Sequence, residues 1–135
     1  MPPAVNKRRE GVHPILLERI DKVHLAMKAI GYPMMLTDGV RSAEVQHDLW
    51  RQGRDKPGKI VTNCDGFDKK SNHQVKDDGF GHAVDSCFLD PNGLPTWNEQ
   101  YPWKAYGELC KAVGLKHGIK LSSDTIDWPH AELPM

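Results

Sequence analysis

Two segments of the sequence combine residue types that bind metal ions in proteins. "KKSNHQVKDDGFGHAVD", which ends at Asp85, and "DTIDWPHAEL", near the C-terminus, supply histidines and carboxylates from distant parts of the chain. Catalytic zinc sites are usually assembled in this way, from three protein ligands and one open position. A metal held there makes hydroxide available at neutral pH, so the combination predicts metal-assisted hydrolysis.

These segments resemble the zinc peptidase family that contains D-alanyl-D-alanine carboxypeptidases and dipeptidases and the phage-type L-alanyl-D-glutamate peptidases. That family is marked by S-x-H-x-x-G-x-A-x-D, followed near the C-terminus by an acidic residue, two variable positions and a histidine. The matching residues here are Ser71, His73, Gly81, Ala83, Asp85, Asp127 and His130. "DGVRSAEVQHDLW" is similar to the family's G-x-R-S segment with its following Gln, and "GVHP" at residues 11–14 is typical of the phage-type branch.

The resemblance implies a metal centre and a general base. His73, Asp85 and His130 would hold one Zn²⁺ as a site of two histidines and one carboxylate. Asp127 would take a proton from the attacking water and return it to the departing amine. The alternative for Asp127 is a surface aspartate next to a strand.

The resemblance also implies residues that contact the substrate. Arg41 cannot lose its charge, so it would stabilise the oxyanion formed at the scissile carbonyl, unless it is an ordinary helix-start arginine that pairs with Asp38 or Glu44. Ser71 would hydrogen-bond the substrate and Gln46 would support its pocket, although either residue can also be purely structural. Trp128 would line the pocket or pack beneath it. Independently of the resemblance, Glu132 lies two residues past His130, on the same face of the expected strand, so it would orient that ligand from outside the metal shell.

The motif departs from the family pattern at one place. Seven residues, Gln74 to Phe80, separate His73 from Gly81, where the family usually has two. We expect this insertion to bulge out of the fold, because loops accept extra residues at small entropic cost. His82 is the competing ligand, but on a strand it points to the face opposite Asp85, so His73 is preferred.

These residues must be positioned by helices and strands, and the order of the expected elements predicts one α+β domain covering residues 1–135. Apolar periodicity and capping residues predict three helices, "HPILLERIDKVHLAMKAIG", "RSAEVQHDLWRQG" and "WKAYGELCKAVGLKHG". Strands are expected at "MMLTDG", "HAVDSCFL", "GIKL" and "IDWPHAEL", with a long loop at residues 54–81. We expect a small, mainly antiparallel sheet packed with about three helices.

The composition excludes several classes of partner and site. Eighteen basic residues balance eighteen acidic ones, which gives no general attraction to nucleic acid or to an anionic membrane. No apolar run is long enough for membrane insertion, and the N-terminus lacks a signal-peptide pattern. Three separated cysteines predict reduced thiols, with Cys87 and Cys110 in the core. A Ca²⁺ site around Asp77 to Gly79, with Asp65 and Asp68, is a further alternative, although the spacing is not that of an EF-hand.

These observations predict a phage-type endolysin that cleaves the L-alanyl-D-glutamate bond of the peptidoglycan stem peptide. We expect a monomer, made in the cytoplasm, that reaches the cell wall after release during host lysis. The first alternative is a D-alanyl-D-alanine carboxypeptidase or dipeptidase. The second is a non-catalytic module that binds the wall.

Overall fold

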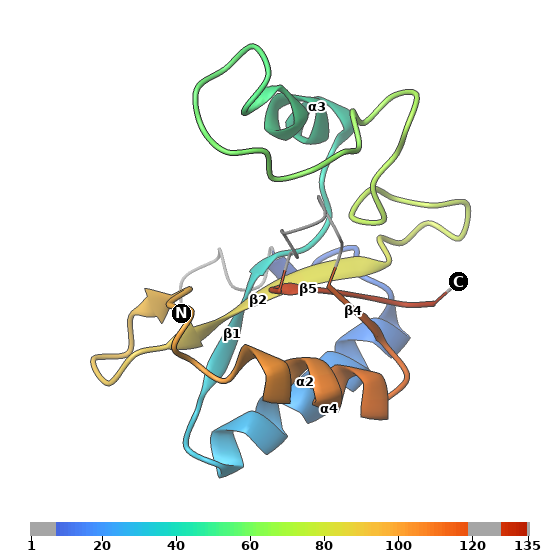
Figure 1. Ribbon diagram of the computed structural model, residues 1–135. Coiled ribbons are helices and arrows are strands. Elements are labelled where there is room, and N and C mark those ends of the chain that lie inside the picture. Colours follow the sequence, from blue (N-terminus) through green and yellow to red (C-terminus); the bar gives the residue numbers. More distant parts are fainter. Residues whose placement is uncertain (1–7, 119–127, 135) are drawn as a thin grey trace.

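The computed structural model describes residues 8–118 and 128–134. Its elements are α2 (Pro14–Ala29), β1 (Met34–Asp38), α3 (Ala43–Arg51), β2 (Ala83–Leu89), β3 (Pro95–Thr96), α4 (Trp103–Ala112), β4 (Lys116–His117) and β5 (His130–Glu132). The strands form an antiparallel sheet in the order β1-β2-β5-β4, with β3 also paired to β2. The predicted α+β fold with a small antiparallel sheet is therefore confirmed (Figure 1).

The core lies between the sheet and two helices. α2 buries four of the five residues of the apolar stripe predicted from its periodicity, Leu16, Ile20, Val23 and Met27. The fifth, Ile30, is wrongly predicted, because the helix ends at Ala29 and Ile30 is an exposed C-cap. α4 buries Trp103, Tyr106 and Cys110. The two helices contact each other and lie together on one side of the sheet (Figure 1). Their packing fixes the central strand β2, which carries Asp85.

The remaining helix, α3, lies on the other side of the sheet, away from α2 and α4 (Figure 1). Ser42 caps its start, where the Ser42 hydroxyl accepts a hydrogen bond from the Val45 N–H at 3.2 Å. Gly53 follows its end with a φ of +82°, a conformation that glycine adopts without strain. Residues 52–82, all of them described, form only turns, bends and isolated bridges, as the predicted long loop requires.

The short strands differ from the prediction. The third helix was predicted to run through residue 118, but α4 ends at Ala112 and Gly114 follows with a φ of +83°. β4 occupies Lys116–His117 in the remainder, just before the predicted "GIKL" strand, most of which lies outside the described residues. β3 was not predicted, because two residues are too few to show an alternating pattern. It follows a turn in which the Asp90 carboxylate accepts hydrogen bonds from the N–H groups of Asn92 and Leu94.

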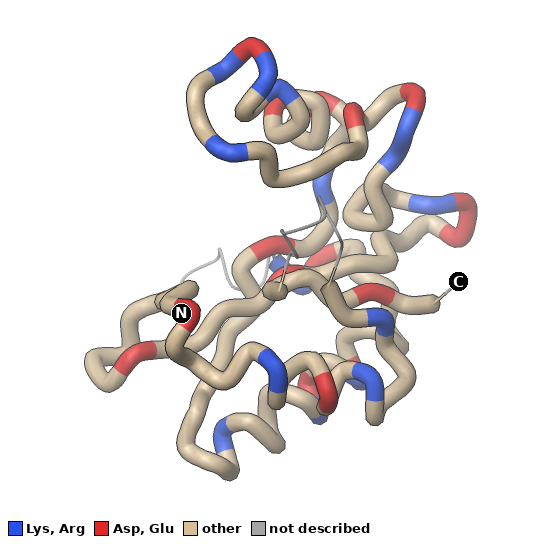
Figure 2. The backbone as a smooth tube through the Cα atoms, in the orientation of Figure 1, with Lys and Arg blue, Asp and Glu red and all other residues tan. Residues whose placement is uncertain are grey.

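The distribution of charged residues and the state of the cysteines agree with the expectations from the composition. Acidic and basic residues are interspersed along the chain in Figure 2. The three cysteines are free, and Cys87 and Cys110 are buried as predicted. Within residues 8–118 and 128–134, the helices are all too short or too polar to cross a lipid bilayer.

Candidate metal centre

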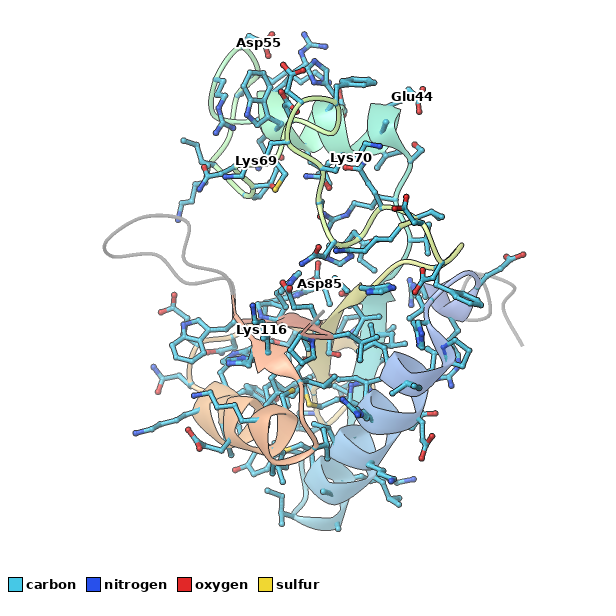
Figure 3. All side chains as sticks on the ribbon, turned by 90° about the vertical axis from the view of Figure 1, so that its right-hand side faces the viewer. Glu44, Asp55, Lys69, Lys70, Asp85 and Lys116 are labelled. Atoms are coloured by element: carbon cyan, nitrogen blue, oxygen red, sulfur yellow. The ribbon has the colours of Figure 1, made fainter. Side chains whose placement is uncertain are left out.

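Three side chains predicted as metal ligands converge from different parts of the chain. Asp85 on β2 pairs in register with His130 on β5, and His73 reaches the same point from the long loop. Nε2 of His73 and Nδ1 of His130 each lie 3.4 Å from Oδ1 of Asp85. The ligand-type atoms of the three residues lie within 4.8 Å of one another. In Figure 3, Asp85 lies between the body of the domain and the part that carries α3.

The polar atoms at this point fit a cation. Nε2 of His73 and Oδ1 of Asp85 are buried and have no hydrogen-bond partner. Nδ1 of His73 lies 2.8 Å from the Gly39 carbonyl, which can only accept, so Nδ1 carries the hydrogen and the Nε2 lone pair faces Asp85. Buried lone pairs without donors are costly, and a metal ion at their centre would satisfy them. Two imidazoles and a carboxylate are a donor set that suits Zn²⁺.

His130 is oriented by Glu132, as the sequence suggested. Nε2 of His130 lies 2.7 Å from Oε1 of Glu132, so this nitrogen carries the hydrogen and Nδ1 faces Asp85. The other carboxylate oxygen of Glu132 accepts a hydrogen bond from the Asn72 amide. A carboxylate behind a histidine in this way fixes the tautomer and makes the ligand more basic. Asn72 gave no signal in the sequence, because it occupies a variable position of the motif.

Asp85 is held in its charged form. Burial alone would raise the pKa of its carboxyl, but without a metal the imidazoles of His73 and His130, when protonated, together outweigh burial and hold that pKa far below its usual range. Oδ2 of Asp85 accepts a hydrogen bond from Arg41 at 3.1 Å. Asp85 therefore presents one oxygen to the candidate metal centre and the other to a permanent cation.

Arg41 makes more contacts than the sequence indicated. Its guanidinium donates to Asp38 at 2.5 Å, as one of the alternatives proposed, and also to Gln46 at 3.0 Å and to Asp85. Gln46 is fully buried, and its amide nitrogen donates to Thr62 and to the Cys64 carbonyl. Gln46 thus holds Arg41 from behind, which accords with the predicted supporting role. The link from Arg41 to Asp85 was not predicted, since it joins residues 44 positions apart.

An open cleft of about 1160 Å³ leads to the centre. Arg41 and Asp85 lie in its wall, and Trp128 lines it as predicted. Ser71 lies elsewhere: its hydroxyl accepts a hydrogen bond from the His73 N–H at 3.1 Å, which shapes the turn that carries His73. Its predicted contact with the substrate remains a prediction.

The insertion leaves the motif residues in contact. A side chain at Gly81 would place its Cβ 2.9 Å from Cγ2 of Val40 and 3.1 Å from the His73 carbonyl oxygen, so glycine allows the loop and the start of β2 to approach closely. Within the insertion, the Lys76 N–H bonds the Phe80 carbonyl at 2.9 Å, which closes a turn. The extra residues therefore bulge out, and His73 still reaches Asp85.

His82 belongs to a second cluster, with Asp78 and His13, as its predicted orientation away from Asp85 requires. Nε2 of His82 lies 2.6 Å from Oδ2 of Asp78, and Nε2 of His13 lies 3.8 Å from the same oxygen. Nδ1 of His13 accepts a hydrogen bond from the Ile15 N–H, so in the neutral ring Nε2 carries the hydrogen. We interpret the hydrogen bond between His82 and Asp78 as an anchor for the insertion, whereas 3.8 Å is too long for a hydrogen bond from His13.

Neither the predicted general base nor the alternative Ca²⁺ site in its predicted form is part of the two clusters found within residues 8–118 and 128–134. Asp127, the predicted general base, lies outside the described residues. For the Ca²⁺ alternative, Asp65 and Asp68 join neither of the two clusters that the described residues form. Oδ1 of Asp65 instead accepts hydrogen bonds from the N–H groups of Phe67 and Lys69, which stabilises a turn in the long loop.

Comparison with known proteins supports the family resemblance. No family model matches the chain. Over 130 residues the chain is 28% identical to the peptidoglycan L-alanyl-D-glutamate endopeptidase CwlK of Bacillus subtilis (strain 168), a match that covers 90% of this chain and 73% of CwlK. The resemblance to peptidoglycan peptidases is therefore confirmed.

Solved structures of peptidoglycan peptidases share the fold. The L-Ala D-Glu endopeptidase ChiX of Serratia marcescens superposes with a TM-score of 0.60 at 24% identity, covering 96% of this chain and 86% of ChiX. The LD-carboxypeptidase LdcB gives a TM-score of 0.58 at 18% identity, covering 92% of this chain and 66% of LdcB. The architecture described above is thus one that peptidoglycan peptidases use.

Proposed function

We propose that this chain is a zinc metallopeptidase that cleaves the L-alanyl-D-glutamate bond of peptidoglycan stem peptides. The observation that carries the proposal is the convergence of His73, Asp85 and His130, with buried lone pairs of His73 and Asp85 facing each other beside an open cleft. The likeness to CwlK supports the choice of bond. The sequence "GVHP" supports the same choice.

In this proposal His73, Asp85 and His130 hold Zn²⁺, which when bound acts as a Lewis acid and lowers the pKa of a coordinated water toward neutrality. Glu132 keeps His130 in the tautomer that turns Nδ1 toward the centre. Asp127 removes the proton of the attacking water and returns it to the departing amine. The DWPH spacing supports this role for Asp127, because it lies three residues before His130.

Arg41 serves two purposes in the proposal. It fixes the orientation of Asp85 through the 3.1 Å hydrogen bond to Oδ2. A guanidinium carries five N–H donors, so the three acceptors of Arg41 leave donors that can face an oxyanion in the cleft. A charge fixed in advance near the reacting carbonyl stabilises the tetrahedral state without reorganisation.

The cleft suits an extended peptide. Its lining includes the aromatic residues Trp97, Tyr101 and Trp128 and residues 59–62 of the long loop. Trp97 and Trp128 are 52% and 40% exposed, so both can cover apolar parts of a substrate. We propose that the enzyme acts as a monomeric endolysin of phage type, on the wall of a host cell during lysis.

Digestion of purified peptidoglycan with added Zn²⁺ tests the proposal. Mass spectrometry should find new N-terminal D-glutamate on the released peptides, and Asp127→Ala should lose nearly all turnover while it keeps its metal. Glu108→Ala, at an exposed position of α4, is the control and should cleave like the wild type. Release of free D-alanine would instead identify the carboxypeptidase alternative, and wall binding without hydrolysis would identify the binding module.

A further inference from the structure

Helix α4 contains a buried glycine, Gly107, at its middle. Glycine is less favourable than alanine inside a helix, because it loses more backbone entropy on folding. A Cβ at Gly107 would lie 2.5 Å from Nδ1 and 2.6 Å from Cε1 of His117. Contacts of that length do not occur between real atoms of these types, so the absent side chain provides the space in which the His117 ring lies.

From this position His117 holds the main chain beside the metal centre. Its Nε2 lies 2.7 Å from the Trp128 carbonyl oxygen, which can only accept, so Nε2 carries the hydrogen. The rings of His117 and Trp128 also contact each other, with centroids 5.5 Å apart. Burial lowers the pKa of His117, so the ring is neutral at neutral pH and donates from Nε2 alone.

In the peptide group between Trp128 and Pro129, the carbonyl oxygen alone can form a hydrogen bond, because Pro129 has no N–H. The next two carbonyls are held as well. The Pro129 oxygen accepts from the Tyr106 hydroxyl and the Ser86 N–H at 3.1 Å each, and the His130 oxygen accepts from the Gly118 N–H at 2.8 Å. The chain is thus fixed from Trp128 in the cleft wall to His130 in the metal centre.

We propose that His117, seated against Gly107, is a positioning residue for the peptidase site. It sets the Trp128 carbonyl and the indole ring, and through them the cleft wall that adjoins His130. The proposal rests on the proposed function, and it adds two residues, Gly107 and His117, that belong to neither the metal shell nor the sequence motif.

Kinetic variants test the role of the Nε2 hydrogen bond. His117→Leu removes the donor and should lower kcat about tenfold or more, because a displacement of about 1 Å near the reaction can cost up to 10²-fold. Bound Zn²⁺ should be retained, because His117 is not one of the proposed metal ligands. His117→Gln, which keeps an N–H at similar reach, should restore part of kcat.

The matched control is His47→Leu. His47 also bonds a main-chain carbonyl, that of Asp65 at 2.9 Å, and stacks on Trp50, but it does not line the cleft. This variant should lower the Tm and leave kcat unchanged. Equal kcat losses in His117→Leu and His47→Leu, or no recovery in His117→Gln, would overturn the positioning role.

A double-mutant cycle of Gly107→Ala and His117→Ala tests the contact without any substrate. Alanine at position 107 should lower the Tm in the wild type and raise it in His117→Ala, where its methyl group meets no ring. Additive Tm shifts in an enzyme that cleaves the wall would overturn this proposal alone. Coupled Tm shifts in a protein that cleaves no wall would confirm the contact and overturn the proposed function, and with it the catalytic role of His117.

Discussion

Glu132 offers a quantitative test of how the metal centre is built. Its carboxylate accepts the Nε2 hydrogen of His130 at 2.7 Å, and its side chain is only 11% exposed. Burial alone would raise the pKa of this carboxyl, but the hydrogen bonds from His130 and Asn72 and the nearby positive charges of His130 and Lys116 together outweigh burial, and the pKa is lowered. Glu132 is therefore an anion at neutral pH, and its contact with His130 is a charge-assisted hydrogen bond.

We predict that Glu132→Ala weakens Zn²⁺ binding by up to about 100-fold, the upper end of the range for residues that orient metal ligands. That factor equals about 2.7 kcal/mol, which agrees with the roughly 1.5–3 kcal/mol of a hydrogen bond to a charged group. Glu132→Gln keeps an oxygen but loses the charge, and its amide hydrogens would oppose those of Asn72. We expect a loss of about tenfold for this variant.

Competition with a chromophoric chelator measures these affinities directly. Glu108→Gln, which removes a carboxylate from the exposed face of α4, is the control and should bind Zn²⁺ like the wild type. Wild-type affinity in both Glu132 variants would refute the reasoning, because His130 would then need no partner to present Nδ1 to the metal.

Three further predictions concern stability and the support of Arg41. Burial lowers the pKa of His24 to about 4, so this ring stays neutral while the unfolded chain takes up a proton. The contribution of His24 to the free energy of unfolding is therefore complete above the unfolded pKa near 6.5 and is lost as the pH falls from 6.5 to about 4. Urea unfolding should show that this free energy falls by up to about 3 kcal/mol in that pH window, and His24→Gln should lack this fall. Gln46→Ala should lower the free energy of unfolding by about 1–3 kcal/mol, measured in urea, because the buried partners of Gln46 lose their hydrogen bonds. It should also lower kcat, because Arg41 is no longer held in place. An unchanged kcat would contradict a role of Gln46 in positioning Arg41. Gly81→Ala should lower the Tm, because its Cβ would meet Val40 at 2.9 Å; a Tm equal to that of the wild type in a thermal scan would show that the loop yields without cost.

The sequence predicted the elements that have a strong local signal. The stripe from Leu16 to Met27 fixed α2, and the Ser42 cap fixed the start of α3, because both patterns lie within one element. The two-residue strands β3 and β4 depend on pairing with β2 and β5, so their own residues carry too little pattern to reveal them.

In the candidate site, the residues of the motif could be predicted from the sequence, but the contacts that support them could not. His73, Asp85 and His130 were predicted from a motif, and the fold brings them together despite the insertion. The contacts behind them join residues far apart in the chain. Arg41 to Asp85 and Asn72 to Glu132 are examples, and no spacing rule connects such pairs before the fold is known.

Bound-metal analysis shows which histidines hold the ion. Purified wild-type protein should contain one Zn²⁺ per chain, and the metal should be lost in His73→Ala and in His130→Ala. His82→Ala should keep it, because His82 faces Asp78 instead of Asp85. Retention of Zn²⁺ by His73→Ala together with its loss in His82→Ala would contradict the account.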